Sequence, residues 1–217
     1  MEKFGKIAVI VPVFNEERTI GLVINNIKKI ATLIVVNDGS TDNTGLILKK
    51  NKSKKIIIIN NKNNLGYENA LNLGFKKAAK LKFNTLITYD ADNQFYIKDL
   101  IKIINLSKKF DLVIGRRPYV QRYSEKVLSK IFKLTFGICD PLCGLKAYSL
   151  KLYKKLGYFD RSLLSGTELM IYGLKNNFST KQININVKKR LGISKFGSGL
   201  RIELYILKIL FFLIIKN

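Results

Sequence analysis

Four short apolar runs in the first ninety residues constrain the fold of this chain more than any other feature. Each run is followed by polar residues and then by a segment with helical spacing of its apolar positions. The runs cover residues 7–13, 33–36, 56–59 and 85–89. Continuous apolar runs of this length are typical of strands that are buried on both faces. Strands that alternate with helices, here over about 17–30 and 67–81, predict βαβ units. We therefore expect an α/β fold with a mainly parallel central sheet and flanking helices.

Composition narrows the chemistry that such a fold can carry. The chain has 217 residues, of which 47% are apolar, so it can form one domain with a large core. It contains no histidine, which excludes histidine-based acid–base catalysis and most catalytic zinc sites. Its two cysteines, Cys139 and Cys143, have no partner ligands beside them, and we expect them to be reduced thiols.

The formal net charge of +24 raises the question of nucleic-acid binding. However, 32 of the 39 basic residues are lysines spread along nearly the whole chain, so we expect no nucleic-acid partner. Arginine is scarce, yet Arg116, Arg117 and Arg122 fall within seven residues. Because arginine binds phosphate through two parallel hydrogen bonds, this cluster favours a contact with phosphate.

Polar side chains gather where the four predicted strands end. They are Asn15 and Glu16, Asp38, Asn63 and Asn64, and Asp90 and Asp92. In a parallel sheet, ligands bind beyond the carboxyl ends of the strands. The chain has 15 acidic residues against 39 basic ones, so this concentration of acids at one predicted edge indicates a binding site.

Asp90 and Asp92 are the most informative of these residues. Side chains two positions apart project to the same side of an extended backbone, so both carboxylates can face one point. Mg²⁺ or Mn²⁺ takes carboxylate oxygens together with substrate phosphates. Taken alone, the stretch is equally compatible with a polar turn. The chain has neither of the two common glycine-rich phosphate loops, so we expect phosphates to be bound through a metal.

The strand ends carry four motifs in a fixed order. They are Pro12-Val-Phe-Asn15-Glu16, Asn37-Asp38-Gly39-Ser40-Thr41-Asp42, Asn64-x-Gly66 and Asp90-Ala-Asp92-x-Gln94. This set resembles the family 2 glycosyltransferases. Two later motifs, Asp140-x-x-x-Gly144-x-Lys146-x-Tyr148 and Arg190-Leu-Gly-Ile-Ser194-Lys195, are similar to those of the polyprenyl-phosphate (dolichol-phosphate) mannose or glucose synthases. The chain departs from the family pattern at Tyr67-Glu68 and Phe95-Tyr96.

The resemblance implies a Rossmann-like GT-A fold over residues 1–199, a GDP-mannose or UDP-glucose donor, and an inverting transfer in one displacement. It assigns the metal to Asp90, Asp92 and Gln94, with Mg²⁺ or Mn²⁺ as the cofactor. It assigns catalytic roles to Asp92 and Arg117. The donor nucleotide would contact Pro12, Val13, Asn15, Glu16, Asp38, Asn64, Gly66, Asp90, Ala91, Arg190 and Lys195. Arg190 and Lys195 would neutralise charge on the leaving diphosphate that the metal leaves uncovered.

The acceptor decides whether a catalytic base is needed. A lipid phosphate is already an anion and needs cations to position it, and the residues expected there are Arg116, Arg117, Arg122, Lys126 and Ser129. A hydroxyl acceptor of a glycan or glycolipid would instead require a carboxylate base. Glu168 is the candidate base, although an acid at a helix start also stabilises the helix by about 0.3–1 kcal/mol. We expect the lipid phosphate and keep the hydroxyl acceptor as the alternative.

Two segments indicate a membrane surface. Residues 123–136 predict a helix with one apolar stripe and one lysine stripe, which suits either an anionic membrane or a core helix with a solvated face. Residues 200–217 are highly apolar, but a helix over 202–215 would extend about 21 Å, which is less than the ~30 Å of a hydrocarbon core. We expect that tail to be an in-plane membrane helix or a docking helix, for example in a homo-oligomer. The start of the chain predicts no signal peptide, so we expect a peripheral protein at the cytoplasmic face of the membrane.

Overall fold

The computed structural model of the chain describes residues 6–119, 122–162 and 166–189. Its strands are β1 (Ile7–Val13), β2 (Thr32–Asp38), β3 (Ile56–Asn61), β4 (Thr85–Thr88), β5 (Leu112–Arg116), β6 (Lys146–Ser149) and β7 (Thr180–Asn184). Its helices are α1 (Ile20–Ile27), α2 (Thr44–Lys50), α3 (Tyr67–Lys80), α4 (Ile97–Leu106), α5 (Tyr123–Phe136), α6 (Leu150–Leu156) and α7 (Glu168–Lys175). Strands and helices alternate along most of the described chain, as the sequence predicts.

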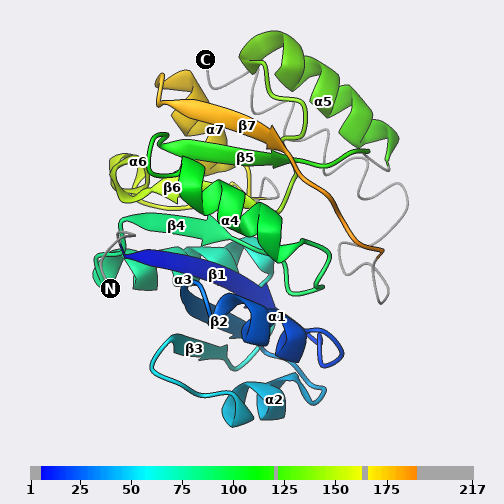
Figure 1. Cartoon of the computed structure of the whole chain (residues 1–217), viewed down its shortest axis with the longest axis vertical. Coiled ribbons are helices and arrows are strands. Elements are labelled where there is room, and N and C mark those ends of the chain that lie inside the picture. The colour runs from blue at the N-terminus through cyan, green and yellow to red at the C-terminus, as the bar shows by residue number, and fades with distance from the viewer. Residues whose placement is uncertain (1–5, 120–121, 163–165, 190–217) are drawn as a thin grey trace.

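The described strands form one sheet in the order β3-β2-β1-β4-β6-β5-β7. All neighbouring strands are parallel except for the two pairs that β6 makes with β4 and β5. Figure 1 shows this sheet running through the centre of the molecule, with helices in front of it and behind it. The predicted α/β fold with a mainly parallel central sheet is therefore confirmed.

Burial on both faces explains the continuous apolar runs of the sequence. In β1, Ala8 and Ile10 pack on the side of α3, α5, α6 and α7, whereas Val9 and Val11 pack on the side of α1, α2 and α4. All four side chains are fully buried. Burying one aliphatic side chain of this size contributes about 1.5–3 kcal/mol. The buried strands therefore position the polar residues that follow them.

The first helix begins later than the sequence predicts. Instead of a helix over 17–30, turns flank α1 on both sides. The N–H of Glu16 donates to Thr44 Oγ1 at 2.9 Å, and the N–H of Glu17 donates to Asp42 Oδ2 at 3.2 Å. These two residues join β1 to the start of α2 before α1 begins. The prediction of a helix that begins at about residue 17 is therefore wrong at its start.

The carboxyl ends of β1 and β4 form the point where the sheet reverses its winding direction. The chain leaves β1 toward β2 on one side, whereas it leaves β4 toward β5 on the other side. Pairing between β1 and β4 ends at Ile10 and Thr88, while β1 continues to Val13. Pro12, which has no N–H to donate, lies in that continuation. Crevices at such reversal points are the usual ligand sites of open α/β sheets.

Several sequence predictions fall outside the described residues. These are Arg190, Lys195 and the apolar tail over 200–217, so the domain boundary at residue 199 also stays a prediction. Among residues 6–119, 122–162 and 166–189, no helix is both long enough and apolar enough to cross a membrane.

Candidate active site

Asp38 joins three segments at the carboxyl edge of the sheet. Its Oδ1 accepts hydrogen bonds from Asn61 Nδ2 at 2.7 Å and from the N–H of Leu65 at 3.0 Å, and its Oδ2 accepts one from the N–H of Gly66 at 2.8 Å. The side chain is buried. Gly66 has a φ of 95°, a backbone angle that favours glycine. Asp38 therefore fixes the loop before α3, and Asn64, which also accepts from Gly66, lies exposed in that loop.

Asn15 connects the ends of β1 and β2. Its Oδ1 accepts a hydrogen bond from the N–H of Thr41 at 2.8 Å, and its N–H donates to Ser40 Oγ at 3.0 Å. Its φ of 51° lies in the left-handed region, which asparagine adopts more readily than most residues. Pro12 and Val13, beside it, are buried in the sheet. The predicted donor residues on these two strands therefore form one connected edge.

The position of Asp90 depends on two residues, Tyr67 and Gly144. The sequence predicts neither contact. The Tyr67 hydroxyl at the start of α3 donates to Asp90 Oδ1 at 3.2 Å. Burial and the charge of Asp90 raise the pKa of this hydroxyl well above its ordinary value, so it stays a donor. On the other side, a Cβ added to Gly144 would lie 2.0 Å from Asp90 Oδ2, so a side chain there would displace the carboxylate. The departure from the family pattern at Tyr67 was the available signal for the first contact.

A buried lysine lies close to the same carboxylate. Lys146 begins β6 opposite Thr88 and is 3% exposed. Its N–H donates to Thr88 Oγ1 at 3.2 Å, which fixes the strand beside β4. Burial lowers the pKa of its ammonium group to about 8, although the negative charges of Asp140 and Asp90 act in the opposite direction. Lys146 therefore adds positive charge near the carboxylate of Asp90, at the carboxyl end of β4.

The loop after β4 is closed by its own side chains. Asp92 is 7% exposed, and its Oδ1 accepts a hydrogen bond from the N–H of Gln94 at 3.0 Å. Asn93 between them has a φ of 59°, and its buried Oδ1 has no hydrogen-bond partner within the described residues. Ala91 is buried. The two carboxylates therefore lie on one tight turn, and that both face one point stays a prediction.

Gln94 and Phe95 connect this loop to the segment after β7. The N–H of Lys188 donates to the Gln94 carbonyl oxygen at 2.8 Å, and Gln94 Nε2 donates to the Lys188 carbonyl oxygen at 3.2 Å. Phe95 and Val187 form an antiparallel bridge. The Gln94 amide thus has a structural partner, and its predicted role as a metal ligand stays a prediction. The same contacts fix the point from which the chain continues toward Arg190.

The donor set of this loop fits a divalent metal. Mg²⁺ and Mn²⁺ are usually held by one or two carboxylates, and substrate phosphates and water complete the coordination. Asp90 and Asp92 supply two carboxylates, and the unsatisfied amide oxygen of Asn93 is a third hard oxygen in the same turn. In the described part of the chain, no group of three or more His, Cys, Asp or Glu residues is arranged as a metal site. A metal here would therefore depend on the donor diphosphate for its remaining ligands.

The predicted arginine cluster divides into two parts. Arg117 donates to Asp140 through its N–H at 2.9 Å, its Nε at 2.8 Å and its Nη2 at 2.9 Å, and Nη2 also lies 3.2 Å from Glu125 Oε2. Arg122 pairs with the other oxygen of Glu125 at 2.7 Å. Both carboxylates are buried. The guanidinium group of Arg116, in contrast, is exposed and has no partner within the described residues. The predicted acceptor roles of Arg117 and Arg122 stay predictions.

Helix α5 packs its apolar stripe on the core. Leu128 and Phe132 are fully buried, whereas Lys126 is exposed and Ser129 is half-buried. Tyr123 and Leu134 are 79% and 78% exposed. The helix is therefore a core helix on one face, and its opposite face combines lysines with exposed apolar side chains.

Glu168 is engaged on both of its carboxylate oxygens. Oε1 accepts a hydrogen bond from the Tyr158 hydroxyl at 2.9 Å. Oε2 accepts from the N–H groups of Arg161 and Ser162 at 2.8 and 2.9 Å. The side chain is 4% exposed at the start of α7. Glu168 is thus an acid at a helix start, which is the structural role that the sequence left open, and it also binds the backbone of Arg161 and Ser162.

Comparison with known proteins identifies the family. The model of glycosyl transferase family 2 matches residues 8–157. An uncharacterised protein of Methanocaldococcus jannaschii is 35% identical over 199 residues, which cover 83% of this chain and 80% of that protein. The UDP-N-acetylglucosamine–dolichyl-phosphate N-acetylglucosaminyltransferase of Methanococcus voltae is 32% identical over 213 residues, with 82% and 84% covered.

A solved structure shares the fold. The glucosyl-3-phosphoglycerate synthase of Mycobacterium tuberculosis, in complex with Mn²⁺ and UDP-glucose, superimposes with a TM-score of 0.74 at 20% identity. The match covers 98% of this chain and 80% of that chain. This similarity shows the GT-A fold. The chain therefore belongs to glycosyl transferase family 2 and is a glycosyltransferase.

Proposed function

We propose that this glycosyltransferase moves a hexose, mannose or glucose, from a nucleotide sugar to a polyprenyl (dolichyl) phosphate at the cytoplasmic face of the membrane. The observation that carries the proposal is the position of Asp90 and Asp92. They follow β4 at the reversal point of the sheet, beside the end of β1 and within one tight turn. A divalent cation held by two carboxylates can bind the negatively charged diphosphate of a nucleotide sugar.

The metal would be Mg²⁺ or Mn²⁺, held by Asp90 and Asp92. It would supply a Lewis acid that neutralises charge on the leaving nucleoside diphosphate. Tyr67 keeps Asp90 oriented through its hydroxyl, and Gly144 leaves room for the carboxylate. The nucleoside would lie along the edge that Asn15 and Asp38 organise, where the β1, β2 and β3 ends are joined by hydrogen bonds.

A phosphate acceptor fits the available side chains better than a hydroxyl acceptor. The phosphate oxygen is already negatively charged, so a single inverting displacement needs no general base. The candidate base for a hydroxyl acceptor, Glu168, has both oxygens engaged by Tyr158, Arg161 and Ser162. The relative from Methanococcus voltae is named for a dolichyl-phosphate acceptor, which supports the same choice. That name also adds an N-acetylhexosamine to the sugars that need testing.

A transfer assay with purified full-length protein tests the proposal. Farnesyl phosphate and a longer polyprenyl phosphate serve as acceptors, and GDP-mannose, UDP-glucose and UDP-N-acetylglucosamine serve as donors, each with Mn²⁺ or Mg²⁺. We expect one donor to give a glycosyl phospholipid detectable by mass spectrometry, and EDTA to abolish the product. The variant Asp92→Ala should lose this activity. Asp111→Asn is a matched control, because Asp111 precedes β5 at the opposite edge of the sheet.

Two results would contradict the proposal. An Asp92→Ala variant that remains active and insensitive to EDTA would remove the metal-dependent mechanism. Transfer to a glycan hydroxyl, with Glu168→Gln losing turnover while donor binding is intact, would favour the alternative acceptor.

Vesicles that contain anionic lipid test the membrane location, because peripheral binding through lysines weakens as the salt concentration rises.

A further inference from the structure

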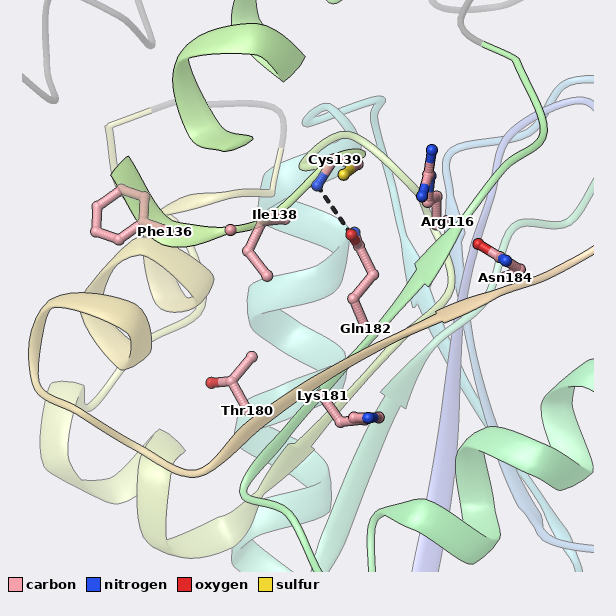
Figure 2. Close-up of a pocket in the computed structure, with 9 residues that line it drawn as sticks. Arg116, Phe136, Ile138, Cys139, Thr180, Lys181, Gln182 and Asn184 are labelled. Carbon is pink, nitrogen blue, oxygen red and sulfur yellow. Dashed lines mark hydrogen bonds between the residues drawn. The ribbon is translucent and has the colours of Figure 1, made fainter. Parts of the chain in front are cut away.

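A pocket of about 380 Å³ lies between β7 and the residues that follow α5. Figure 2 shows Gln182 rising from β7 toward the backbone of Cys139, with Phe136 and Ile138 on one side of it and Arg116 and Asn184 on the other. The pocket therefore has an apolar end and a polar end. No residue at its polar end takes part in the metal loop.

Gln182, which lines the pocket, carries a hydrogen-bond donor that no described residue uses. Gln182 Oε1 accepts from the N–H of Cys139 at 2.8 Å, which fixes the amide so that Nε2 is the other group. That Nε2 is buried and has no hydrogen-bond partner in the described part of the chain. A buried donor without a partner is unfavourable, so a ligand oxygen that reaches this position would be favoured.

Arg116 supplies the positive charge at the polar end. It pairs with Asn184 across β5 and β7, two residues along from the pair of Ile114 and Gln182. Side chains two residues apart on a strand lie on the same face, so Arg116 and Gln182 face the same side of the sheet. Arg117 is engaged by two carboxylates, whereas Arg116 is exposed and forms no ion pair with any described residue, so its guanidinium group can bind an anion.

The polar end is also within reach of the donor site. Asp90 points to the α3 side of the sheet, because Tyr67 of α3 donates to it. Arg116 lies on the same side, since its strand neighbours Leu112 and Ile114 pack with α3 in one core. One strand, β6, separates β4 from β5, so the ends of β4 and β5 are roughly 10 Å apart at about 4.8 Å per strand. A sugar on a metal-bound diphosphate can bridge such a distance.

We propose that this pocket receives the phosphate end of the polyprenyl phosphate, with Arg116 and Gln182 Nε2 as its donors. The first isoprene unit would contact Phe136 and Ile138 at the apolar end. The proposal rests on the proposed function for the identity of the acceptor. It assigns to Arg116, Gln182 and Asn184 the recognition of an amphiphilic phosphate, and it leaves Arg117 to hold the surrounding loops together.

Three variants and one control test the site through kinetics. Gln182→Glu keeps the oxygen that accepts from Cys139 but replaces the free donor with a negative charge, and Arg116→Gln removes the cation. Each should raise the KM for farnesyl phosphate about 10-fold or more, a factor that corresponds to 1.4 kcal/mol, and change the donor KM less than about twofold. Arg116→Lys should recover part of the loss. Lys154→Gln, which removes an exposed charge from α6, should change neither constant.

Direct binding separates this proposal from the proposed function. Cys139 lines the pocket, so bound ligand should slow its alkylation by iodoacetamide. We expect farnesyl phosphate to protect Cys139 in the wild type but not in Arg116→Gln, with weaker protection by farnesol or inorganic phosphate. Such protection would support the pocket even if no sugar transfer is found. Equal protection in wild type and Arg116→Gln, or a parallel rise of donor and acceptor KM, would overturn it.

Discussion

Replacing Arg117 by alanine should primarily destabilise the fold rather than weaken acceptor binding. The guanidinium group and N–H of Arg117 make three hydrogen bonds to Asp140, which is 1% exposed, and one to Glu125, which is 4% exposed. Burial lowers the pKa of Arg117, but the hydrogen bonds and charge of Asp140 outweigh this and raise it above its ordinary value. The arginine is therefore charged at every pH of interest.

The magnitude follows from the carboxylates that the substitution leaves behind. Removing one partner of a buried ion pair costs about 3–5 kcal/mol. The Arg117 side chain is 24% exposed and Glu125 keeps Arg122, so we expect the lower end, about 3 kcal/mol. For a chain of this length, that corresponds to a fall in Tm of roughly 6–12 °C. Arg116→Ala, at the adjacent exposed residue, should change the free energy of unfolding by less than about 0.5 kcal/mol.

The assay is thermal and urea unfolding of the two single variants and of a double-mutant cycle with Asp140→Asn. Because the neutral asparagine amide of that variant would need no counter-charge, Arg117→Ala should cost less in that background, with a coupling of about 1–3 kcal/mol. The reasoning would be refuted by an Arg117→Ala variant that unfolds within 1–2 °C of the wild type (roughly the effect of a surface substitution). Additive effects of Arg117→Ala and Asp140→Asn on the free energy of unfolding would refute it as well.

Three further predictions concern the residues around Asp90 and the thiols. Tyr67→Phe removes the hydroxyl that donates to Asp90 and should weaken Mn²⁺ binding with UDP by roughly 2- to 10-fold, measured by electron paramagnetic resonance of free Mn²⁺; unchanged affinity would contradict the contact. Gly144→Ala places a Cβ 2.0 Å from Asp90 Oδ2, so it should weaken Mn²⁺ binding more than Tyr67→Phe does, in the same experiment. Burial raises the pKa of the Cys143 thiol to about 12, so iodoacetamide at pH 8 should modify Cys139 alone in the native protein and both thiols in denaturant; two modified thiols in the native protein would contradict that burial.

Local patterns in the sequence predict the elements that carry the site. The helices predicted over 67–81 and 123–136 are α3 and α5 within one residue at each end. The strand ends at Asp38 and Asp90 lie at the same edge of the sheet, as the alternation of strands and helices predicts. The first helix begins later than predicted, because the N–H groups of Glu16 and Glu17 bond to Thr44 and Asp42, which no local pattern reveals.

The arginine cluster shows where sequence reasoning reaches its limit. Three arginines close together indicate a phosphate contact, and nothing local distinguishes one of them from another. In the structure, Asp140, which lies 23 residues beyond Arg117, binds two nitrogens of its guanidinium group. The motif around Asp140 is recognisable in the sequence, but its position against Arg117 cannot be read from it.

The sequence by itself determined the α/β fold, the family and the acidic strand ends, because apolar periodicity and short motifs act over a few neighbouring residues. The tertiary structure alone decided which side chains meet. It placed Tyr67 and Gly144 against Asp90, engaged Glu168 with the loop before it, and set Arg116 beside Gln182 on one face of the sheet. The reason is physical: these contacts join residues on different elements, and the order of strands in the sheet sets which elements are neighbours.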